Sequence, residues 1–350
     1  MKKIFFAAVL FGLALASCQK QDELNVNHPT KGEQVQLTVG VQGKNLATRA
    51  TGVSEGAAGE GKVNKLEVFV FDAANNQLEA YGTANNATEV VVSCTAGERV
   101  IYALVNAEDD LSAVATVDQL LAVVSDLSDN EVAGFEMIGS TTTSVTKENE
   151  TVPVSIDVNR FAARVVIREI VRDFTSTALQ AVDFSVDAIY ITNVATQMNY
   201  GYTMTNNVWY NQFSTPAEPF VPYVSECGDL TYDAVGADVA EDASYATEHF
   251  LYGYPNPHFD GELDESDVDL QAETRLVIET TLDGVKRFYP IALPALQSNK
   301  SYEVAKLTLT RPGSLSPDQE ITVVDALFEV NVVDWTTVLL GEEGDGNITI

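Results

Sequence analysis

The sequence predicts a mainly β protein made of two β-sandwich domains, with one short helix in the first domain. Apolar and polar residues alternate in many short runs, which is typical of strands that bury one face. Only one segment has convincing helical spacing. Roughly 300 of the 350 residues follow the amino-terminal segments described below, and one hydrophobic core seldom organises so long a chain. These three observations favour two sandwiches.

The amino terminus has the features of an exported lipoprotein. Lys2 and Lys3 precede an apolar run, Ile4 to Ala16, that is too short to span a bilayer. The run ends in Leu-Ala-Ser-Cys18, the arrangement of a bacterial lipobox, in which the thiol is acylated before the signal is removed. We therefore expect Cys18 to carry lipid. An ordinary signal peptide with a chance cysteine is the alternative.

The first predicted strand covers residues 34–42, after a polar tether. Its apolar side chains fall on one face, and they are Val35, Leu37, Val39 and Val41. Residues 43–61 are rich in Gly, Ala, Ser and Thr, and we expect them to be a linker that packs little. Residues 56–62 resemble a phosphate-binding loop, but they precede a strand where a helix is required, so we assign them to the linker. Arg49 lies in this stretch.

The remaining elements follow in order. The predicted helix begins at Thr116, where Thr-Val-Asp-Gln119 matches a capping box and apolar residues then recur at helical spacing. Residues 215–269, rich in Pro, Tyr and acidic side chains, are expected to be loops. The further predicted strands are 65–72, 90–93, 99–106, 151–158, 161–171, 181–194, 276–281, 285–290, 302–310 and 320–335.

Composition argues against several classes of function. The net charge of −31, from 51 acidic and 20 basic residues, opposes binding to nucleic acid or to anionic lipid. His249 and His258 lack partners at metal-ligand spacing, and we expect them on surface loops. The Gly-x-Ser-x-Gly spacing of a nucleophile elbow occurs only at residues 52–56, inside the expected linker, where no strand-to-helix turn is predicted. We therefore expect no catalytic residue, no metal, no cofactor and no enzyme.

Two alternatives stay open. The carboxylates between Asp260 and Asp269, or those at Glu342, Glu343 and Asp345, could collect calcium, although a solvated loop is the more usual role. A disulfide between Cys94 and Cys227 could form outside the cytoplasm.

Several segments spread along most of the chain resemble the FimA/Mfa-like fimbrillin family, the subunits of type V pili. Each is weak alone, and their order together with the lipobox and an arginine site makes the resemblance specific. Besides Cys18 and Ala47-Thr48-Arg49-Ala50, the segments are Leu66–Asp72, Phe135–Gly139, Asn159–Val166, Phe250–Asn256, Ser298–Val304 and Val330–Trp335. The resemblance implies two transthyretin-like β-sandwich domains and a structural subunit of a cell-surface fimbrium.

The family also implies a processing route. A lipoprotein precursor on the outer membrane is cut by an Arg-specific surface protease, and its subunits, with related pilus subunits, then polymerise by strand exchange. On this chain the cut would separate Arg49 from Ala50 and remove the strand that contains Val35 to Val41. The implied parts are a signal peptide (1–17), a lipidated propeptide (18–49) and two domains (50–158 and 159–350).

The carboxyl terminus suits the role of donor strand. Residues 330–335 are the last expected native strand, and a tail follows at about 336–350 that consists of alternating residues and a Gly-rich hinge. The residues of this donor tail that would face the accepting subunit are Thr336, Val338, Leu340, Ile348 and Ile350. The alternative is that the tail only finishes the second sandwich.

A stalk subunit is thus the first hypothesis, and an accessory tip or anchor pilin is the second. A glycan-binding surface lipoprotein is the third, with sugar stacked on an aromatic cluster of Tyr200, Tyr202, Trp209, Tyr210, Phe213, Phe220 and Tyr223.

Overall fold

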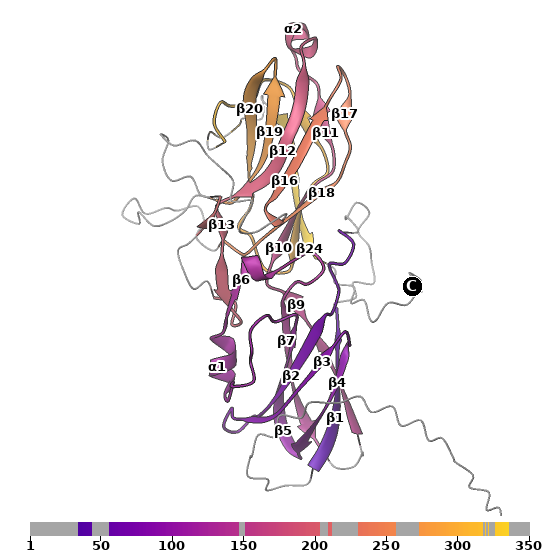
Figure 1. The fold of residues 1–350 in the computed structure, drawn as a ribbon, viewed down its shortest axis with the longest axis vertical. Coiled ribbons are helices and arrows are strands. Elements are labelled where there is room, and N and C mark those ends of the chain that lie inside the picture. Colours follow the sequence, from indigo (N-terminus) through magenta and orange to yellow (C-terminus); the bar gives the residue numbers. More distant parts are fainter. Residues whose placement is uncertain are drawn as a thin grey trace, which may run out of the picture.

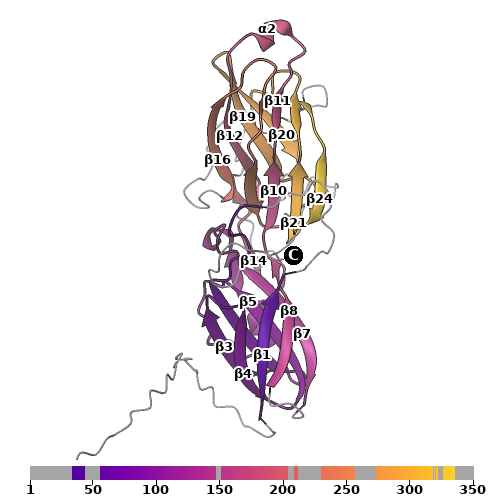
Figure 2. The ribbon, with the colours of Figure 1, turned by 90° about the vertical axis from the view of Figure 1, so that its right-hand side faces the viewer.

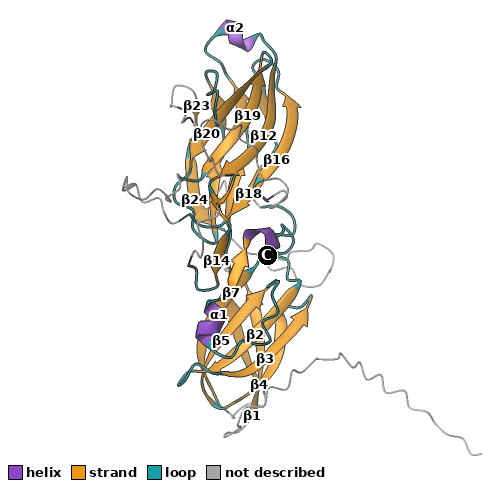
Figure 3. Ribbon diagram, turned by 60° about the vertical axis from the view of Figure 1, so that its left-hand side comes forward, coloured by secondary structure: helices purple, strands orange, loops and turns teal. Residues whose placement is uncertain are grey.

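The computed structural model describes residues 34–43, 56–146, 151–203, 209–211, 230–256, 273–317, 319, 321 and 326–335. Two β-sandwiches follow one another along an elongated molecule (Figures 1 and 2). Strands dominate both, and the helices are short (Figure 3). The predicted mainly β fold is confirmed. No helix in the described part is long and apolar enough to cross a bilayer.

The first sandwich packs a three-stranded sheet on a five-stranded sheet. The smaller sheet has the order β4 (Glu89–Thr95), β1 (Gln34–Gln42), β8 (Thr151–Asp157). The larger has the order β3 (Leu78–Asn85), β2 (Lys65–Asp72), β5 (Gly97–Val105), β7 (Met137–Val145), β9 (Asn159–Arg160). Strand β2 buries six consecutive residues because both of its faces are covered.

The predicted helix is α1 (Val117–Leu121). Thr116 caps it, since its Oγ1 accepts a hydrogen bond from the Gln119 backbone N–H at 3.2 Å. The Gln119 side chain reaches back and accepts from the Ala115 N–H at 2.8 Å, one residue before the partner expected in a capping box. Val117 and Leu120 face the core. The helix start that the sequence predicted is therefore correct.

The second sandwich also has two layers. One is the sheet β16 (Tyr232–Asp238), β12 (Phe184–Thr192), β19 (Arg275–Leu282), β20 (Val285–Ala292). The other is interrupted across its middle into two sheets. Its first half is β18 (His249–Gly253), β10 (Ala163–Ile167), β21 (Lys300–Val304), β24 (Val330–Asp334), and its second half is β17 (Ser244–Tyr245), β11 (Ile170–Arg172), β22 (Leu307–Leu309), β23 (Ala326–Leu327).

Short elements complete the fold. A second helix, α2 (Thr177–Gln180), lies at the far end of the second sandwich (Figure 1). The sequence predicted only one helix and did not identify this one. Strand β6 (Val124–Asp126), from the first half of the chain, pairs with β14 (Gln197–Asn199), and a 3-10 turn follows β6 at Leu127–Asp129. Strand β13 (Val194–Ala195) pairs with β15 (Trp209–Tyr210).

Two expectations are wrong. The expected loop region 215–269 contains three strands, since β16, β17 and β18 form within residues 232–253. The small residues and a left-handed Gly236 (φ 62°) in β16 concealed its alternation. The end of the proposed linker also packs, because Glu60 and Gly61 are buried. The sequence pattern did not separately identify β3 and β7, whose outward faces carry many polar or small residues.

Candidate functional site

Strand β1 is the middle strand of its sheet. It runs antiparallel to β4, with Gln34 opposite Thr95, and parallel to β8, with Gln42 opposite Asp157. Both of its backbone edges are therefore occupied. Without β1, β4 and β8 would be separated and each would expose a row of unpaired N–H and C=O groups. We call the space between β4 and β8 the β1 slot.

The four apolar side chains of β1 fill this slot. Leu37 and Val39 are fully buried, while Val35 and Val41 are 3% and 8% exposed. The strand and its buried face are thus where the sequence predicted them. Burying one such side chain contributes roughly 1.5–3 kcal/mol, so the four contribute on the order of 6–12 kcal/mol before ordering costs.

Cys94 lines the slot at the end where β1 begins. It lies on β4 opposite Val35 and is 1% exposed. It forms no disulfide within the described residues. Burial, with a smaller contribution from the Glu79 carboxylate, raises the pKa of the Cys94 thiol to about 11. The thiol is therefore neutral and shielded while β1 is in place.

The other predicted site residues lie outside the described residues. These are Cys18, Arg49, Ala50 and the tail residues Thr336, Val338, Leu340, Ile348 and Ile350. Cys227 and both acidic segments considered for calcium are outside as well. Within the described part, no group of three or more His, Cys, Asp or Glu side chains is arranged to hold a metal ion.

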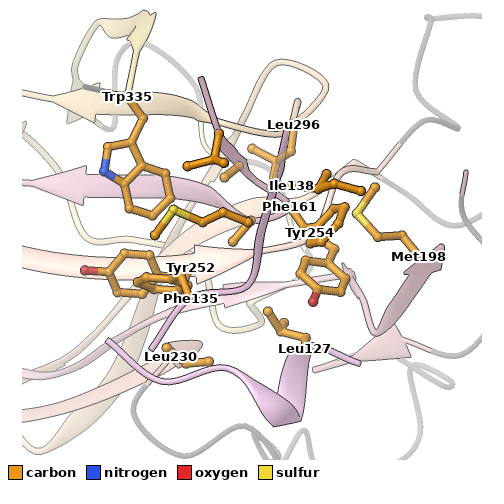
Figure 4. Packing of buried hydrophobic residues seen from close by; sticks show 14 of the residues in the cluster. Leu127, Phe135, Ile138, Phe161, Met198, Leu230, Tyr252, Tyr254, Leu296 and Trp335 are labelled. Atoms are coloured by element: carbon orange, nitrogen blue, oxygen red, sulfur yellow. The ribbon is translucent and has the colours of Figure 1, made fainter. Parts of the chain in front are cut away.

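A second site, which the sequence did not reveal, joins the two sandwiches. Its apolar part centres on Phe135, Tyr252 and Trp335 (Figure 4). The Phe135 ring lies 4.8 Å from the Tyr252 ring and 5.4 Å from the Trp335 ring, between centroids. The Tyr252 and Trp335 rings stack at 5.6 Å. We call this cluster and the polar groups around it the junction.

A buried carboxylate, Glu60, lies at the centre of the junction. Its Oε2 accepts hydrogen bonds from Arg164 Nη1 at 2.9 Å and from Trp335 Nε1 at 3.0 Å. Its Oε1 accepts from the Tyr252 hydroxyl at 2.7 Å and from the Ala57 backbone N–H at 3.1 Å. A carboxylate that accepts four hydrogen bonds, one from a guanidinium, is well compensated for its burial.

Two arginines supply the positive charge of the junction. The Arg160 guanidinium lies 4.1 Å from the centre of the Trp335 ring and donates to the Glu60 carbonyl at 2.8 Å. Burial lowers the pKa of Arg160 to about 10, so it stays protonated at neutral pH. Arg164 also reaches Ser301 Oγ at 3.0 Å and Glu303 Oε1 at 3.5 Å.

A second polar group crosses the junction nearby. Ser125 of the first sandwich donates to the Glu136 carboxylate and is hydrogen-bonded to the hydroxyl of Tyr254, which comes from the second sandwich. Asn130 Nδ2 also donates to the Tyr254 hydroxyl, at 2.9 Å. Burial raises the pKa of Glu136 to about 7. This carboxyl group therefore titrates near neutral pH.

The described members of the aromatic cluster are packed against the protein. Tyr200, Trp209 and Tyr210 are 2%, 4% and 7% exposed. Tyr202 is partly exposed and packs on the Phe161 ring with a centroid distance of 5.2 Å. Three of the four therefore offer no free face to a sugar. Phe213, Phe220 and Tyr223 lie outside the described residues.

The expected surface position of His249 is wrong. It lies on β18 and is 6% exposed. Its Nδ1 is hydrogen-bonded to Asp233 Oδ2 at 2.5 Å, and its Nε2 to the Tyr245 hydroxyl at 2.9 Å. Because β16, β17 and β18 were not foreseen as strands, their cross-strand partners could not be foreseen either. This histidine therefore links β16, β17 and β18 through side-chain hydrogen bonds.

Comparisons with known proteins agree with this architecture. Residues 34–162 match the family model of the major fimbrial subunit protein (FimA). No curated protein matches the chain. A candidate cell adhesion protein from Bacteroides eggerthii has a similar structure, with a TM-score of 0.63 and 16% identity, covering 89% of this chain and 99% of its own.

Two proteins of Porphyromonas gingivalis share the fold as well. Its fimbrilin (FimA) has a TM-score of 0.61 and 15% identity, with 87% of this chain and 98% of its own covered. Its tip fimbrial protein Mfa3, with a carboxy-terminal truncation, has a TM-score of 0.51 and 12% identity, with 87% and 100% covered. At these identities the similarity concerns the fold. With the family match over residues 34–162, the resemblance of this chain to the FimA/Mfa-like family of fimbrial subunits is confirmed.

Proposed function

We propose that this chain is a polymerising stalk subunit of a cell-surface fimbrium. It is exported as an outer-membrane lipoprotein acylated on Cys18, and an Arg-specific surface protease cuts it between Arg49 and Ala50. The cleaved subunits then assemble by donor-strand exchange with further copies and with related pilus subunits. The central position of β1 in its sheet is the observation that supports this proposal most directly. The subunit is structural and has no catalytic role.

The proposed step follows from the geometry of β1. In the precursor β1 is continuous with the rest of the chain, so it occupies its slot at a very high effective concentration. A cut at Arg49 converts it into a separate peptide. Once it dissociates, an apolar slot with two unpaired backbone edges is open to a strand from another chain, by β-augmentation.

The tail at residues 336–350 is the proposed donor. Fully extended, its fifteen residues span at most about 50 Å. A replacement for the nine-residue β1 takes up about 30 Å of this length. About 20 Å then remains as a spacer. If Trp335 stays in the junction, the open slot of the next subunit must lie within that distance of it.

The same processing defines the parts of the chain. We propose a signal peptide at residues 1–17, a propeptide at 18–49, and domains at 50–158 and 159–350. Strand β8 ends at Asp157 in the first sandwich and β10 begins at Ala163 in the second, which supports a boundary near this position. The short strand β9 (Asn159–Arg160) still pairs with β7 of the first sandwich, so the sheets themselves change over just after it.

The proposal is tested by comparing the wild-type chain with Arg49→Lys, which keeps the positive charge and resists an Arg-specific protease. After protease treatment, the wild-type protein should form ladders on a gel run without boiling. The Arg49→Lys variant should fold and remain a monomer. Ladders from the uncut variant would contradict the mechanism.

A deletion of residues 336–350 tests the donor separately. This variant should accept a donor strand but not provide one, so it should shorten wild-type fibres when mixed with them. Long fibres made from the deletion variant alone would exclude the tail as donor. The amino-terminal residue found on intact cells separates stalk from anchor, since Ala50 supports the stalk and acylated Cys18 an anchor.

A further inference from the structure

We propose that the buried Glu60 carboxylate is a shared anchor for the two ends of the mature chain. It holds the first described segment after the cleavage site, residues 56–63, and it also holds Trp335, the residue before the donor tail. The importance of these two ends rests on the proposed function. The anchor itself is a feature of the uncut chain and can be tested there.

The segment after the cleavage site is held close to the carboxylate. Gly56 has φ +85°, and a Cβ built on it would lie 2.3 Å from Glu60 Oε2 and 2.4 Å from Arg164 Nη1. The positive φ favours glycine here, and any larger residue would also have to displace the ends of the Glu60 and Arg164 side chains. The Ala57 N–H then donates to Glu60 Oε1, and the Lys62 N–H closes a turn onto the Gly59 carbonyl at 2.9 Å. The chain therefore enters the first sandwich through the junction.

The other end is held in the junction by Trp335, which follows the edge strand β24. Strand β24 is an edge strand, and Val332 on it is 46% exposed. Trp335 in contrast is 1% exposed. Its backbone N–H donates to the Asn299 carbonyl at 3.0 Å and its Nε1 to Glu60 Oε2. The residue that precedes the proposed donor tail is thus fixed at one point of the junction.

The charges explain why the anchor is shared. Glu60 and Glu303 are the carboxylates that pair with the buried guanidinium of Arg164, and Arg160 lies against the same Trp335 ring. Removing the Glu60 charge leaves buried positive charge less compensated and takes a strong acceptor away from the Trp335 N–H. One substitution should therefore loosen two segments that lie 275 residues apart in sequence.

Hydrogen exchange on the uncut chain tests this coupling. In Glu60→Gln, amide exchange should rise at least tenfold both in residues 57–62 and at Trp335. Glu79→Gln is the matched control, since Glu79 on β3 pairs with the buried Arg99 on β5, with 2.6 Å between Oε2 and Nε, away from the junction. The control should raise exchange near Thr95 and leave both ends at the wild-type rate. A change at only one end, or at neither, would overturn the proposal.

Trp335→Phe covers the case in which Glu60→Gln fails to fold. Phenylalanine keeps a ring against Arg160 and Tyr252 but lacks the indole N–H that Glu60 accepts. Exchange in residues 57–62 should still rise several-fold, because the carboxylate loses one of its partners. Wild-type rates there would show that the two ends are held independently. Neither variant requires cleavage. Unchanged exchange in these variants would therefore contradict the shared anchor without affecting the Arg49→Lys test of assembly, and a negative Arg49→Lys result would not affect the exchange test.

Discussion

Shortening Leu37 to alanine should weaken the precursor and leave the assembled fibre unchanged. Leu37 lies in the middle of β1, between Val92 of β4 and Val152 of β8, and is fully buried. Replacing such a leucine by alanine costs about 2–5 kcal/mol, because it removes buried methyl groups and leaves a cavity. At the lower limit, the fraction of precursor with β1 out of its slot rises roughly 30-fold.

The fibre should not respond, because residue 37 precedes the proposed cut and leaves with the propeptide. Leu66→Ala is the matched control. Leu66 is equally buried, but it lies on β2, which stays in the mature subunit. The control should therefore lower the stability of both the precursor and the fibre.

Two measurements separate the cases. Urea unfolding of the uncut chain gives the loss of stability in the precursor, and both variants should show it. The temperature at which ladders of the cleaved protein dissociate reports on the fibre, and only Leu66→Ala should lower it. If Leu37→Ala lowers that temperature as much as the control does, β1 remains in the fibre and the proposed exchange is wrong.

Two further predictions concern buried groups. In a Cys227→Ser background, Cys94 should react with N-ethylmaleimide very slowly in the uncut chain, much faster once β1 has left, and slowly again in the fibre. Mass spectrometry measures the rate of labelling in each state. Equal rates before and after release of β1 would mean that the slot does not open. Burial raises the pKa of Glu136 to about 7. At a pH between the ordinary pKa of a glutamate and 7, the folded chain therefore keeps a proton on this carboxyl group that the unfolded chain has released. Stability should therefore fall as pH rises from 5 to 8, by at most about 3 kcal/mol from this group. Glu136→Gln should lessen that fall in urea midpoints, and an unchanged pH dependence would contradict the assignment.

Local patterns were sufficient to predict β1 and α1. In β1, alternation alone identified the buried face from Val35 to Val41, because the side chains of a strand point to opposite sides in turn. In α1, the hydroxyl of Thr116 identified the first turn, because it can satisfy a backbone N–H that the helix leaves open. In both elements the information lies within about ten consecutive residues.

The junction could not be predicted in this way. Glu60 lies among glycines and alanines, so its neighbours in sequence suggest a solvated linker. The residues that make its burial favourable are far away along the chain. Arg164, Tyr252 and Trp335 are separated from it by 104, 192 and 275 positions. A single sequence gives no sign that such residues meet, and a lone carboxylate is more often exposed.

Most of the sequence segments that were quoted for the resemblance to fimbrillins contribute to the junction. Five of the quoted segments contribute a residue to it, namely Phe135, Arg164, Tyr252, Ser301 and Trp335. They are scattered in sequence and look unrelated until the fold brings them together. These residues determine how the two sandwiches are joined.

The β1 slot has a different requirement under the proposed mechanism. It must hold its own strand in the precursor and a foreign strand in the fibre, so its walls cannot be specific for one set of side chains. Alternating apolar residues and a free backbone edge are what two such strands have in common. The buried residues of β1 are Val, Leu, Val and Val, whereas the proposed tail offers Thr, Val, Leu and two Ile. A slot that two strands occupy in turn requires the same alternation of apolar residues in both, but not the same residues.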